Sequence, residues 1–197
     1  MSALRRSDLD PDPLRQVDRW RYEAAEAGVD TTLAALATAS ATGRPSVRMV
    51  LVKGVDEGVF RFYTNYESRK AAELAENPLA ALLFHWPGRQ VRVEGGVERL
   101  PEAESDAYFD SRPPGSRLSA AVSPQSRPVG SRGELEAAVE ELRQRHPDGA
   151  VPRPASWGGY LLRPGTFEFW QHDRHRMHDR FRYTTADGGW LVERLGP

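Results

Sequence analysis

The sequence contains no cysteine, and its formal net charge at pH 7 is only −1. The lack of cysteine excludes disulfides, thiolate nucleophiles, iron–sulfur clusters and cysteine-ligated zinc. A nearly neutral chain gives no support for nucleic acid or a membrane surface as a partner. No apolar run approaches membrane-spanning length, and the first residues lack the apolar core of a signal peptide. We therefore expect a cytoplasmic protein, and its 197 residues suffice for one substantial domain.

The two common nucleotide-binding loops, GxGxxG and GxxxxGK(S/T), are also absent. Apolar and aromatic segments separated by turn residues predict about seven strands, mostly joined by hairpins, within 31–52, 59–64, 79–94, 157–170 and 181–195. Helical spacing predicts helices over 13–27, 69–76, 101–109 and 132–146. Because the strands do not alternate with helices, a doubly wound parallel sheet is disfavoured. We expect an α+β fold, mainly antiparallel β: a barrel with peripheral helices, in a single domain over 1–197 whose residues 1–11 form a flexible arm.

Four local details follow from composition and spacing. Residues 157–162 and 166–170 are expected to be separate strands, and 110–116 an irregular exit from the helix at 101–109. Residues 123–133, rich in serine, proline and glycine, have the composition of a mobile linker. In the helix at 132–146, the spacing of Leu135, Val139 and Leu142 predicts a buried stripe.

The predicted helix at 69–76 begins with two cations, Arg69 and Lys70, directly after the expected N-cap Ser68. A helix N-terminus is already positive, because its first N–H groups are unpaired and the helix dipole adds to them. A bound phosphate would reverse this disadvantage, since basic side chains and helix N-termini both attract it. The two side chains could equally extend into water and pair with Glu67 or Glu73, and the local sequence does not decide between these interpretations.

A second concentration of charge lies in 167–183, where four arginines and three histidines are interleaved. His172, His175 and His178 have a spacing of three, which suits metal ligands poorly on a strand or a helix, so no metal site is expected. A solvated polar loop is the simplest interpretation. On a strand, Arg176, His178 and Arg180 would share one face, where guanidinium groups can bind an anion and a histidine can move a proton.

Motifs spread over nearly the whole chain, from about Leu4 to Pro197, carry a family resemblance. They are LRRSDLDPDPL, RMVLVK, FYTNYESRK, RQV, YFDSRPPGS, SPQS, WGGY, FEFWQ, HRMHDR and ERLGP. In their order and spacing they resemble the pyridoxine/pyridoxamine 5′-phosphate oxidase family, FMN enzymes that produce pyridoxal 5′-phosphate. The resemblance implies an FMN-binding split β-barrel and a homodimer that holds FMN at the subunit interface with residues from both chains.

The resemblance also implies the residues of the site. The implied FMN-binding residues are Arg48, Met49, Lys53, Tyr63, Thr64, Arg69, Lys70, Gln90, Gln125, Ser126, Trp170 and Arg180. The implied contacts of the substrate phosphate are Lys53, Tyr108, Arg112 and Ser116. Arg176 and His178 would cover the pyridine ring as the catalytic residues, Arg176 orienting the substrate and His178 assisting in position and protonation.

The implied reaction is oxidation at C4′ of pyridoxine or pyridoxamine 5′-phosphate, with a hydride equivalent passing to flavin N5 and O₂ then reduced to H₂O₂. Three departures from the family pattern stand out: little sequence before LRRSDL, a shortened turn at 85–89, and His172-Asp173-Arg174 in place of a glycine-containing turn after FWQ. They motivate an alternative, a related FMN oxidase for another planar substrate such as a phenazine precursor in secondary metabolism. A non-catalytic flavin or pyridoxal-phosphate binding protein is a third interpretation.

Overall fold

The computed structural model describes residues 3–197, except for the side chain of Asp56. Its strands are β1 Leu33–Ala39, β2 Pro45–Asp56, β3 Val59–Asn65, β4 Leu79–Trp86, β5 Arg89–Arg99, β6 Trp157–Gln171, β7 Asp179–Ala186 and β8 Gly189–Leu195. Its helices are α1 Pro13–Glu26, α2 Arg69–Glu76, α3 Glu102–Asp110, α4 Pro114–Val122 and α5 Arg132–Arg145, and a short 3₁₀ turn spans Arg6–Asp8. None of the helices in this described part is long and apolar enough to cross a membrane.

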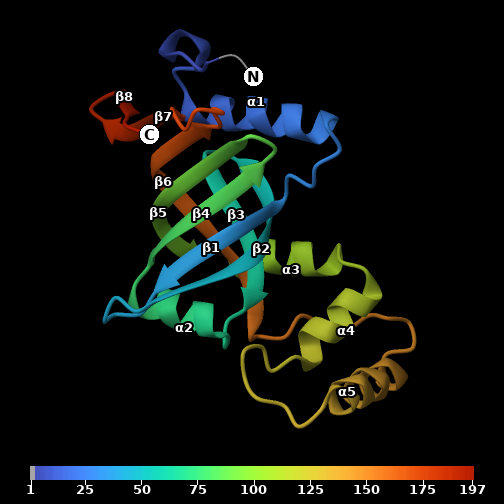
Figure 1. Ribbon diagram of the computed structural model, residues 1–197. Helices are drawn as coiled ribbons and strands as arrows, with labels where there is room; N and C mark the ends of the chain where they lie inside the picture. Colours follow the sequence, from blue (N-terminus) through green and yellow to red (C-terminus); the bar gives the residue numbers. More distant parts are fainter. Residues whose placement is uncertain (1–2) are drawn as a thin grey trace.

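Six of the strands form a closed antiparallel barrel in the order β3-β2-β1-β4-β5-β6, and pairing of β3 with β6 completes the ring (Figure 1). Strands β7 and β8 continue outward from β6 as a hairpin. The antiparallel barrel with peripheral helices that the sequence predicts is confirmed.

The barrel interior is filled by alternate residues of each strand, as the two-residue period of a strand requires. In β4, for example, Ala80, Leu82, Phe84 and Trp86 are buried while their neighbours are more exposed. Large rings from two neighbouring strands meet inside: Phe60 of β3 lies 6.1 Å from Phe167 of β6, centroid to centroid. Each such fully buried apolar side chain stabilises the fold by about 1.5–3 kcal/mol.

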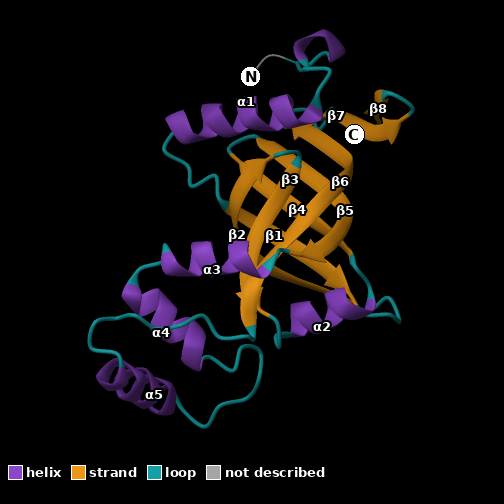
Figure 2. Cartoon of the chain, turned by 180° about the vertical axis from the view of Figure 1, so that it is seen from behind, coloured by secondary structure: helices purple, strands orange, loops and turns teal. Residues whose placement is uncertain are grey.

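Two helices cover the ends of the barrel, and three others project from its side (Figures 1 and 2). Helix α1 crosses one end, where Trp20 packs edge-on against Phe169 at 5.3 Å. Helix α2 lies at the other end and buries Ala71 and Leu74. Helices α3, α4 and α5 lead away from the α2 end, and α5 is the farthest from the barrel.

Strand β6 is continuous where the sequence predicts two strands. A register shift between Glu94 and Gly95 lets β5 follow it past Pro164. Gly95 is required at this bulge, because a Cβ there would lie 1.9 Å from the carbonyl oxygen of Arg163. The prediction of a break near 163–165 was therefore wrong, since a bulge absorbs the irregular residues without ending the ladder.

The helical side region also differs from the prediction. Residues 114–122, partly assigned to an irregular exit, form helix α4, with Pro114 in the first turn. Helix α5 has no buried residue within the described chain, so the stripe of Leu135, Val139 and Leu142 is only partly covered. The segment before α5 is anchored within the chain, because Asn65 donates from Nδ2 to the Ser123 carbonyl at 3.3 Å and Arg127 pairs with Glu67 at 2.9 Å.

The described part of the predicted N-terminal arm, from Ala3 onward, packs against the β7–β8 hairpin. Leu4 is buried, and its N–H donates to Asp179 Oδ2 at 2.8 Å. Arg194 of β8 donates from Nη2 to the Leu4 carbonyl at 2.8 Å. These contacts differ from the expected loose segment, because one apolar residue and its backbone give the arm a fixed position; residues 1–2 of the prediction lie outside the described chain.

Candidate functional site

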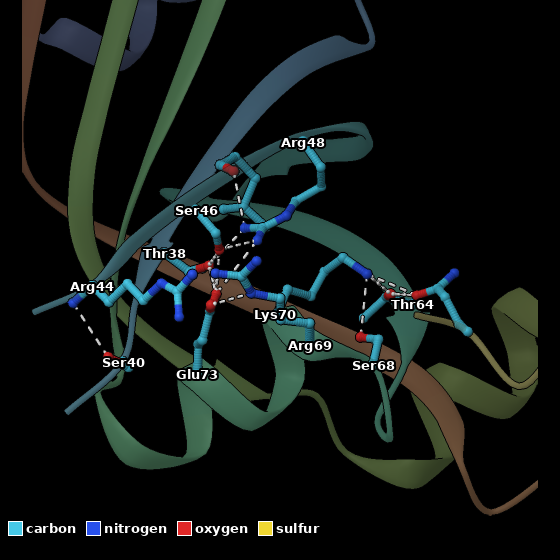
Figure 3. Close-up of polar contacts among 12 residues, drawn as sticks. Thr38, Ser40, Arg44, Ser46, Arg48, Thr64, Ser68, Arg69, Lys70 and Glu73 are labelled. Carbon is cyan, nitrogen blue, oxygen red and sulfur yellow. Dashed lines mark hydrogen bonds and ion pairs between the residues drawn. The ribbon is translucent and has the colours of Figure 1, made fainter. Parts of the chain in front are cut away.

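Lys70, in the first turn of α2, is buried among uncharged groups (Figure 3). Its Nζ donates to Thr64 Oγ1 at 2.9 Å, to Ser68 Oγ at 3.2 Å and to Gln125 Oε1 at 2.7 Å. Burial, and then the positive charge of Arg48, lowers the pKa of Lys70 from 10.5 to about 8. A buried ammonium group without a carboxylate partner is costly, and a bound anion would compensate it.

Glu73 organises the other cations of this cluster (Figure 3). Glu73 is 6% exposed, and its carboxylate accepts from Thr38 Oγ1, from Ser46 Oγ and, at 2.8 Å, from Arg69 Nε. Burial acts to raise the pKa of Glu73, but the hydrogen bonds from Ser46, Thr38 and Arg69 outweigh it and bring the value to about 2. Arg48 approaches the same carboxylate at 3.4 Å. Glu73 therefore stays ionised and fixes two guanidinium groups beside Lys70.

The sequence left two interpretations of the cations at the start of α2, a phosphate site or pairing with a glutamate. The structure gives a different answer for Arg69 than for Lys70. Arg69 does pair with Glu73, as the alternative to a phosphate site foresaw. Lys70 instead turns inward, and the structure records no ion pair for it among the described residues. Arg48, Arg69 and Lys70 thus bring three positive charges to a cluster in which Glu73 supplies one negative charge. The net positive potential suits an anion with two negative charges, such as a phosphate monoester.

A cavity of about 500 Å³ lies next to this cluster, between the barrel and the α3–α4 region. Residues from several distant segments line it: Leu51, Lys53, Tyr63, Thr64, Asn65, Tyr108, Arg112, Pro113, Ser116, Ser119, Ala120, Ser123, Gln125 and Trp157. The four predicted contacts of a substrate phosphate are all among them, together with three further predicted FMN contacts, Tyr63, Thr64 and Gln125. The structure therefore brings these seven side chains together around one cavity.

Stacked aromatic rings form one wall of the cavity. Tyr63 and Tyr108 stack at 3.7 Å between ring centroids, and Tyr108 lies 6.2 Å from Trp157. The guanidinium carbon of Arg112 sits 4.7 Å above the Trp157 ring. Arg112 Nη1 is buried without a hydrogen-bond partner in the part of the chain that the structure describes, and burial lowers the pKa of this guanidinium. An unpaired buried donor of positive charge at a cavity is typical of an anion-binding site.

Arg176 and His178 lie in a different place, the loop that joins β6 to β7. The expectation that Arg176, His178 and Arg180 share one face of a strand was wrong, because β6 ends at Gln171 and β7 starts at Asp179. His178 packs against Trp170, with ring centroids 4.7 Å apart. No group of three or more histidine, aspartate or glutamate side chains within residues 3–197 is arranged to hold a metal ion.

The remaining predicted flavin residues also lie outside the cavity. Gln90 and Trp170 are cross-strand neighbours in β5 and β6. Arg180 is held by buried Glu168, whose Oε1 accepts from Arg180 Nε at 2.8 Å. Met49 is 59% exposed on the outer face of β2, and Ser126 is an exposed loop residue. Within one chain the predicted flavin set therefore falls into separate groups.

Sequence reasoning did not identify three residues that organise these groups. Trp157 supplies part of the aromatic wall, Glu168 anchors Arg180, and Glu73 was considered only as a surface partner. Spacing gave a signal for one of them, because Glu73 follows Arg69 by four residues on a helix. Nothing local marks the other two, since their roles depend on strand pairing.

Comparison with known proteins supports this reading of the geometry. The family model described as pyridoxamine 5′-phosphate oxidase matches residues 23–146, and the model described as pyridoxine 5′-phosphate oxidase C-terminal dimerisation region matches 157–197. A pyridoxine/pyridoxamine 5′-phosphate oxidase of Ralstonia nicotianae is 54% identical over 100% of this chain and 94% of its own length. One from Anaeromyxobacter dehalogenans is also 54% identical, over 95% of this chain and 96% of its own.

Two solved structures have the same fold. The crystal structure of PhzG from Burkholderia lata, in complex with tetrahydrophenazine-1-carboxylic acid, has a TM-score of 0.92 and 32% identity, covering 100% of this chain and 99% of that one. A pyridoxamine 5′-phosphate oxidase-related, FMN binding protein from Nostoc punctiforme superposes with a TM-score of 0.73 at 23% identity, covering 94% and 97%, and shows the split-barrel fold alone. From the matched models and the full-length relatives, the chain belongs to the pyridoxine/pyridoxamine 5′-phosphate oxidase family of flavoproteins.

Proposed function

We propose that this protein is an FMN-dependent oxidase that converts pyridoxine 5′-phosphate and pyridoxamine 5′-phosphate to pyridoxal 5′-phosphate. The observation that carries the proposal is a pair of incompletely neutralised cations. Arg112 lines the cavity, and its Nη1 has no hydrogen-bond partner among the described residues. Lys70 is buried beside the cavity and donates to two of its lining residues, Thr64 and Gln125. Each of these two cations can bind one phosphate, so the site suits two phosphorylated ligands that lie side by side. The relatives that share 54% of the sequence bear the name of this oxidase.

The cluster at α2 fits the phosphate of FMN. Arg48, Arg69 and Lys70 supply the charge, and the Thr64 and Ser68 hydroxyls are already within hydrogen-bonding distance of Lys70. A phosphate here would give Lys70 the anionic partner that its uncharged neighbours cannot provide. Lys53, Tyr63 and Gln125 line the adjoining cavity, where we place the rest of the cofactor.

The α3–α4 end of the cavity fits the phosphate of the substrate. Tyr108 and Ser116 offer hydroxyl donors, and Arg112 offers a guanidinium with a donor to spare. Guanidinium groups bind phosphate oxygens through two parallel hydrogen bonds, which fixes orientation as well as charge. Lys53 also lines the cavity, and it contacts both ligands in this proposal.

The active protein in this proposal is a homodimer. Trp157 of β6 pairs with Asn65, whereas Trp170 pairs with Gln90, thirteen residues further along the strand. At about 3.3 Å per residue, the two ends of β6 are roughly 40 Å apart. Residues at the Trp170 end therefore reach a flavin at the α2 end only when a second subunit brings them there.

An apolar outer face provides the surface for this second subunit. Leu33 and Leu51 are cross-strand neighbours, as are Leu83 and Ala35, and Met49 also pairs with Ala35. The exposed fractions of these larger side chains range from 37% for Leu83 to 59% for Met49. Contiguous exposed apolar residues mark a protein interface. The match of residues 157–197 to a model described as a dimerisation region supports the dimer itself, and the residues of this apolar face lie outside that range.

The chain's residues bind and orient, and the cofactor carries the redox chemistry. Bound FMN would supply a hydride acceptor for C4′ of the substrate and a donor of electrons to O₂, which leaves as H₂O₂. Arg112 and its neighbours fix the substrate phosphate, so the C4′ carbon is held in one place. Arg176 and His178 of the second subunit would then cover the pyridine ring, where Arg176 orients the substrate and His178 assists in position and protonation. The alcohol substrate is converted directly, whereas the amine also consumes water and releases ammonia.

A second candidate is oxidation of a dihydro- or tetrahydro-phenazine. The fold similarity to PhzG and the altered turn at His172-Asp173-Arg174 favour it. The phosphate contacts weigh against it, because a phenazine carboxylate has no phosphate for Arg112, Tyr108 and Ser116 to bind. The identity of 32% with PhzG is also well below the 54% shared with the named oxidases.

One assay separates these functions. Purified protein is loaded with FMN and given pyridoxine 5′-phosphate, pyridoxamine 5′-phosphate or tetrahydrophenazine-1-carboxylic acid under air. We expect a yellow protein, pyridoxal 5′-phosphate from the first two substrates and an equal amount of H₂O₂. If flavin-loaded protein produces no aldehyde and no peroxide, the proposal is rejected, and turnover of the tetrahydrophenazine alone would establish the second candidate.

We expect the reaction to take place in the cytoplasm.

A further inference from the structure

The loop between β6 and β7, residues 172–178, is built around one side chain and its own peptide group. Asp173 Oδ1 accepts from the His175 N–H at 2.8 Å, which closes a short turn through the side chain. The Asp173 carbonyl accepts from the Arg176 N–H at 3.2 Å. The Asp173 N–H donates to His178 Nδ1 at 3.1 Å. One residue thus contacts three others in the loop, including both predicted catalytic residues.

The bond to His178 determines which ring nitrogen carries the proton. Nδ1 accepts a hydrogen bond, so it presents a lone pair, and the neutral ring keeps its proton on Nε2. The ring is also fixed in position, because its centroid lies 4.7 Å from Trp170 and 5.4 Å from His172. His178 is therefore presented as an Nε2–H donor in a defined orientation.

The bond to Arg176 supports a backbone conformation that arginine rarely adopts. Arg176 has φ +62°, in the left-handed region, where a residue with a Cβ is strained by about 1–2 kcal/mol. The turn closed by the Asp173 side chain fixes the two residues that precede Arg176. The hydrogen bond from the Arg176 N–H to the Asp173 carbonyl then fixes the backbone at Arg176 itself. The hydrogen bond from the His175 N–H also lowers the pKa of Asp173, so its carboxylate is the form that closes the turn at neutral pH.

We propose that Asp173 is a positioning residue for the oxidase reaction: it sets the tautomer of His178 and the backbone of Arg176, and so aims both at the substrate of the second subunit. The role in catalysis rests on the proposed function of Arg176 and His178. The role in the loop does not, because it follows from the three contacts alone. Asp173 itself is not expected to touch the substrate.

The proposal is tested with two substitutions and two readouts. Asp173→Ala removes the side-chain acceptor, whereas Asp173→Asn keeps an oxygen at the same position. Asp187→Ala, in the exposed β7–β8 turn, is the matched control for loss of an aspartate. The first readout is ¹⁵N NMR of the ring nitrogens in histidine-labelled protein, which has five histidines, with His178→Gln identifying the signals. The second is kcat/KM, measured together with the affinity for FMN.

In the wild type we expect the His178 signals of a ring protonated on Nε2. In Asp173→Ala we expect them to move toward a mixture of tautomers, and kcat/KM to fall about tenfold or more while FMN affinity changes less than about twofold. Asp173→Asn should restore most of the wild-type NMR signals of His178 and most of kcat/KM. An Nδ1-protonated His178 in the wild type, or unchanged NMR signals and kcat/KM in Asp173→Ala, would overturn the proposal. If the wild type itself does not oxidise the vitamers, the proposed function fails, and the NMR comparison still decides the role of Asp173 in the loop.

Discussion

Replacing Lys70 by methionine removes a buried positive charge and keeps a side chain of similar length. In the folded protein without cofactor, burial and Arg48 lower the pKa of Lys70 from 10.5 to about 8. At about 1.4 kcal/mol per pKa unit, that difference corresponds to roughly 3 kcal/mol. Below about pH 8, Lys70 is charged in both the folded and the unfolded chain, so the folded state bears the full cost of burying the charge.

The sign of the pH effect follows from proton binding. Between about pH 8 and 10.5 the unfolded chain keeps the Lys70 proton and the folded chain has lost it. Raising the pH through this window therefore stabilises the folded wild type, whereas Lys70→Met has no group to titrate there. We expect the free energy of unfolding of the wild type to rise, relative to Lys70→Met, by about 2–3 kcal/mol between pH 7 and pH 10. Tyrosines that titrate in this range affect both proteins and cancel in the difference.

The assay is urea unfolding of both cofactor-free proteins at pH 7 and pH 10, with FMN binding measured in parallel. Because the chain has only two lysines, Lys53 and Lys70, selective ¹³C-lysine labelling also gives the Lys70 titration directly. We expect a midpoint near 8 without cofactor and a higher one with FMN, since a bound phosphate favours the ammonium form. Lys70→Met should bind FMN weaker by about 1.5–3 kcal/mol.

Parallel stability curves for the two proteins would refute this reasoning, because they would mean that Lys70 has the same pKa in the folded and unfolded chain. A Lys70 midpoint that FMN leaves unchanged would separately reject the phosphate site at α2. The two results are independent, so the burial of the charge and the identity of its ligand are tested apart.

Three further predictions concern the phosphates and the dimer. Arg69→Ala should weaken FMN binding by about 1.5–3 kcal/mol in a fluorescence titration, whereas Arg145→Ala, a surface arginine of α5, should leave it unchanged. Arg112→Ala should raise KM for pyridoxine 5′-phosphate by about tenfold or more in steady-state kinetics, with FMN affinity retained; an unaltered KM would place the substrate phosphate elsewhere. Val47→Glu, on the apolar outer face, should shift the protein toward monomers in sedimentation and reduce flavin retention, while Tyr22→Glu on α1, equally exposed, should do neither.

The barrel was predictable because its signals are local. Two-residue alternation and short turns predict hairpins, and hairpins give an antiparallel sheet. The wrong predictions of the fold occur where strand pairing or helix formation overrides a local turn signal. Pro164 and Gly165 read as a turn, yet the ladder passes them through a bulge at Gly95. Pro113 and Pro114 read as irregular chain, although a proline in the first turn is compatible with the helix that follows.

The candidate site was predictable in part for the same reason. Misplaced cations at the start of α2 are visible in the sequence, but the burial of Lys70 and its uncharged partners are not. The contacts of Tyr108, Arg112 and Ser116 came from the family resemblance, and the cavity brings them together. The placement of Arg176 and His178 was wrong because charge alone does not distinguish the tip of a hairpin from its strands.

The contact between Leu4 and Asp179 has a practical consequence for anyone who purifies this enzyme. Asp179 accepts from the Leu4 N–H through one oxygen and from Arg194 Nη1, at 2.6 Å, through the other. Protease trimming past Leu4 therefore removes a hydrogen-bond partner from a carboxylate that directly follows His178 in the chain. A preparation whose N-terminal segment is intact through Leu4 is the standard against which to compare turnover.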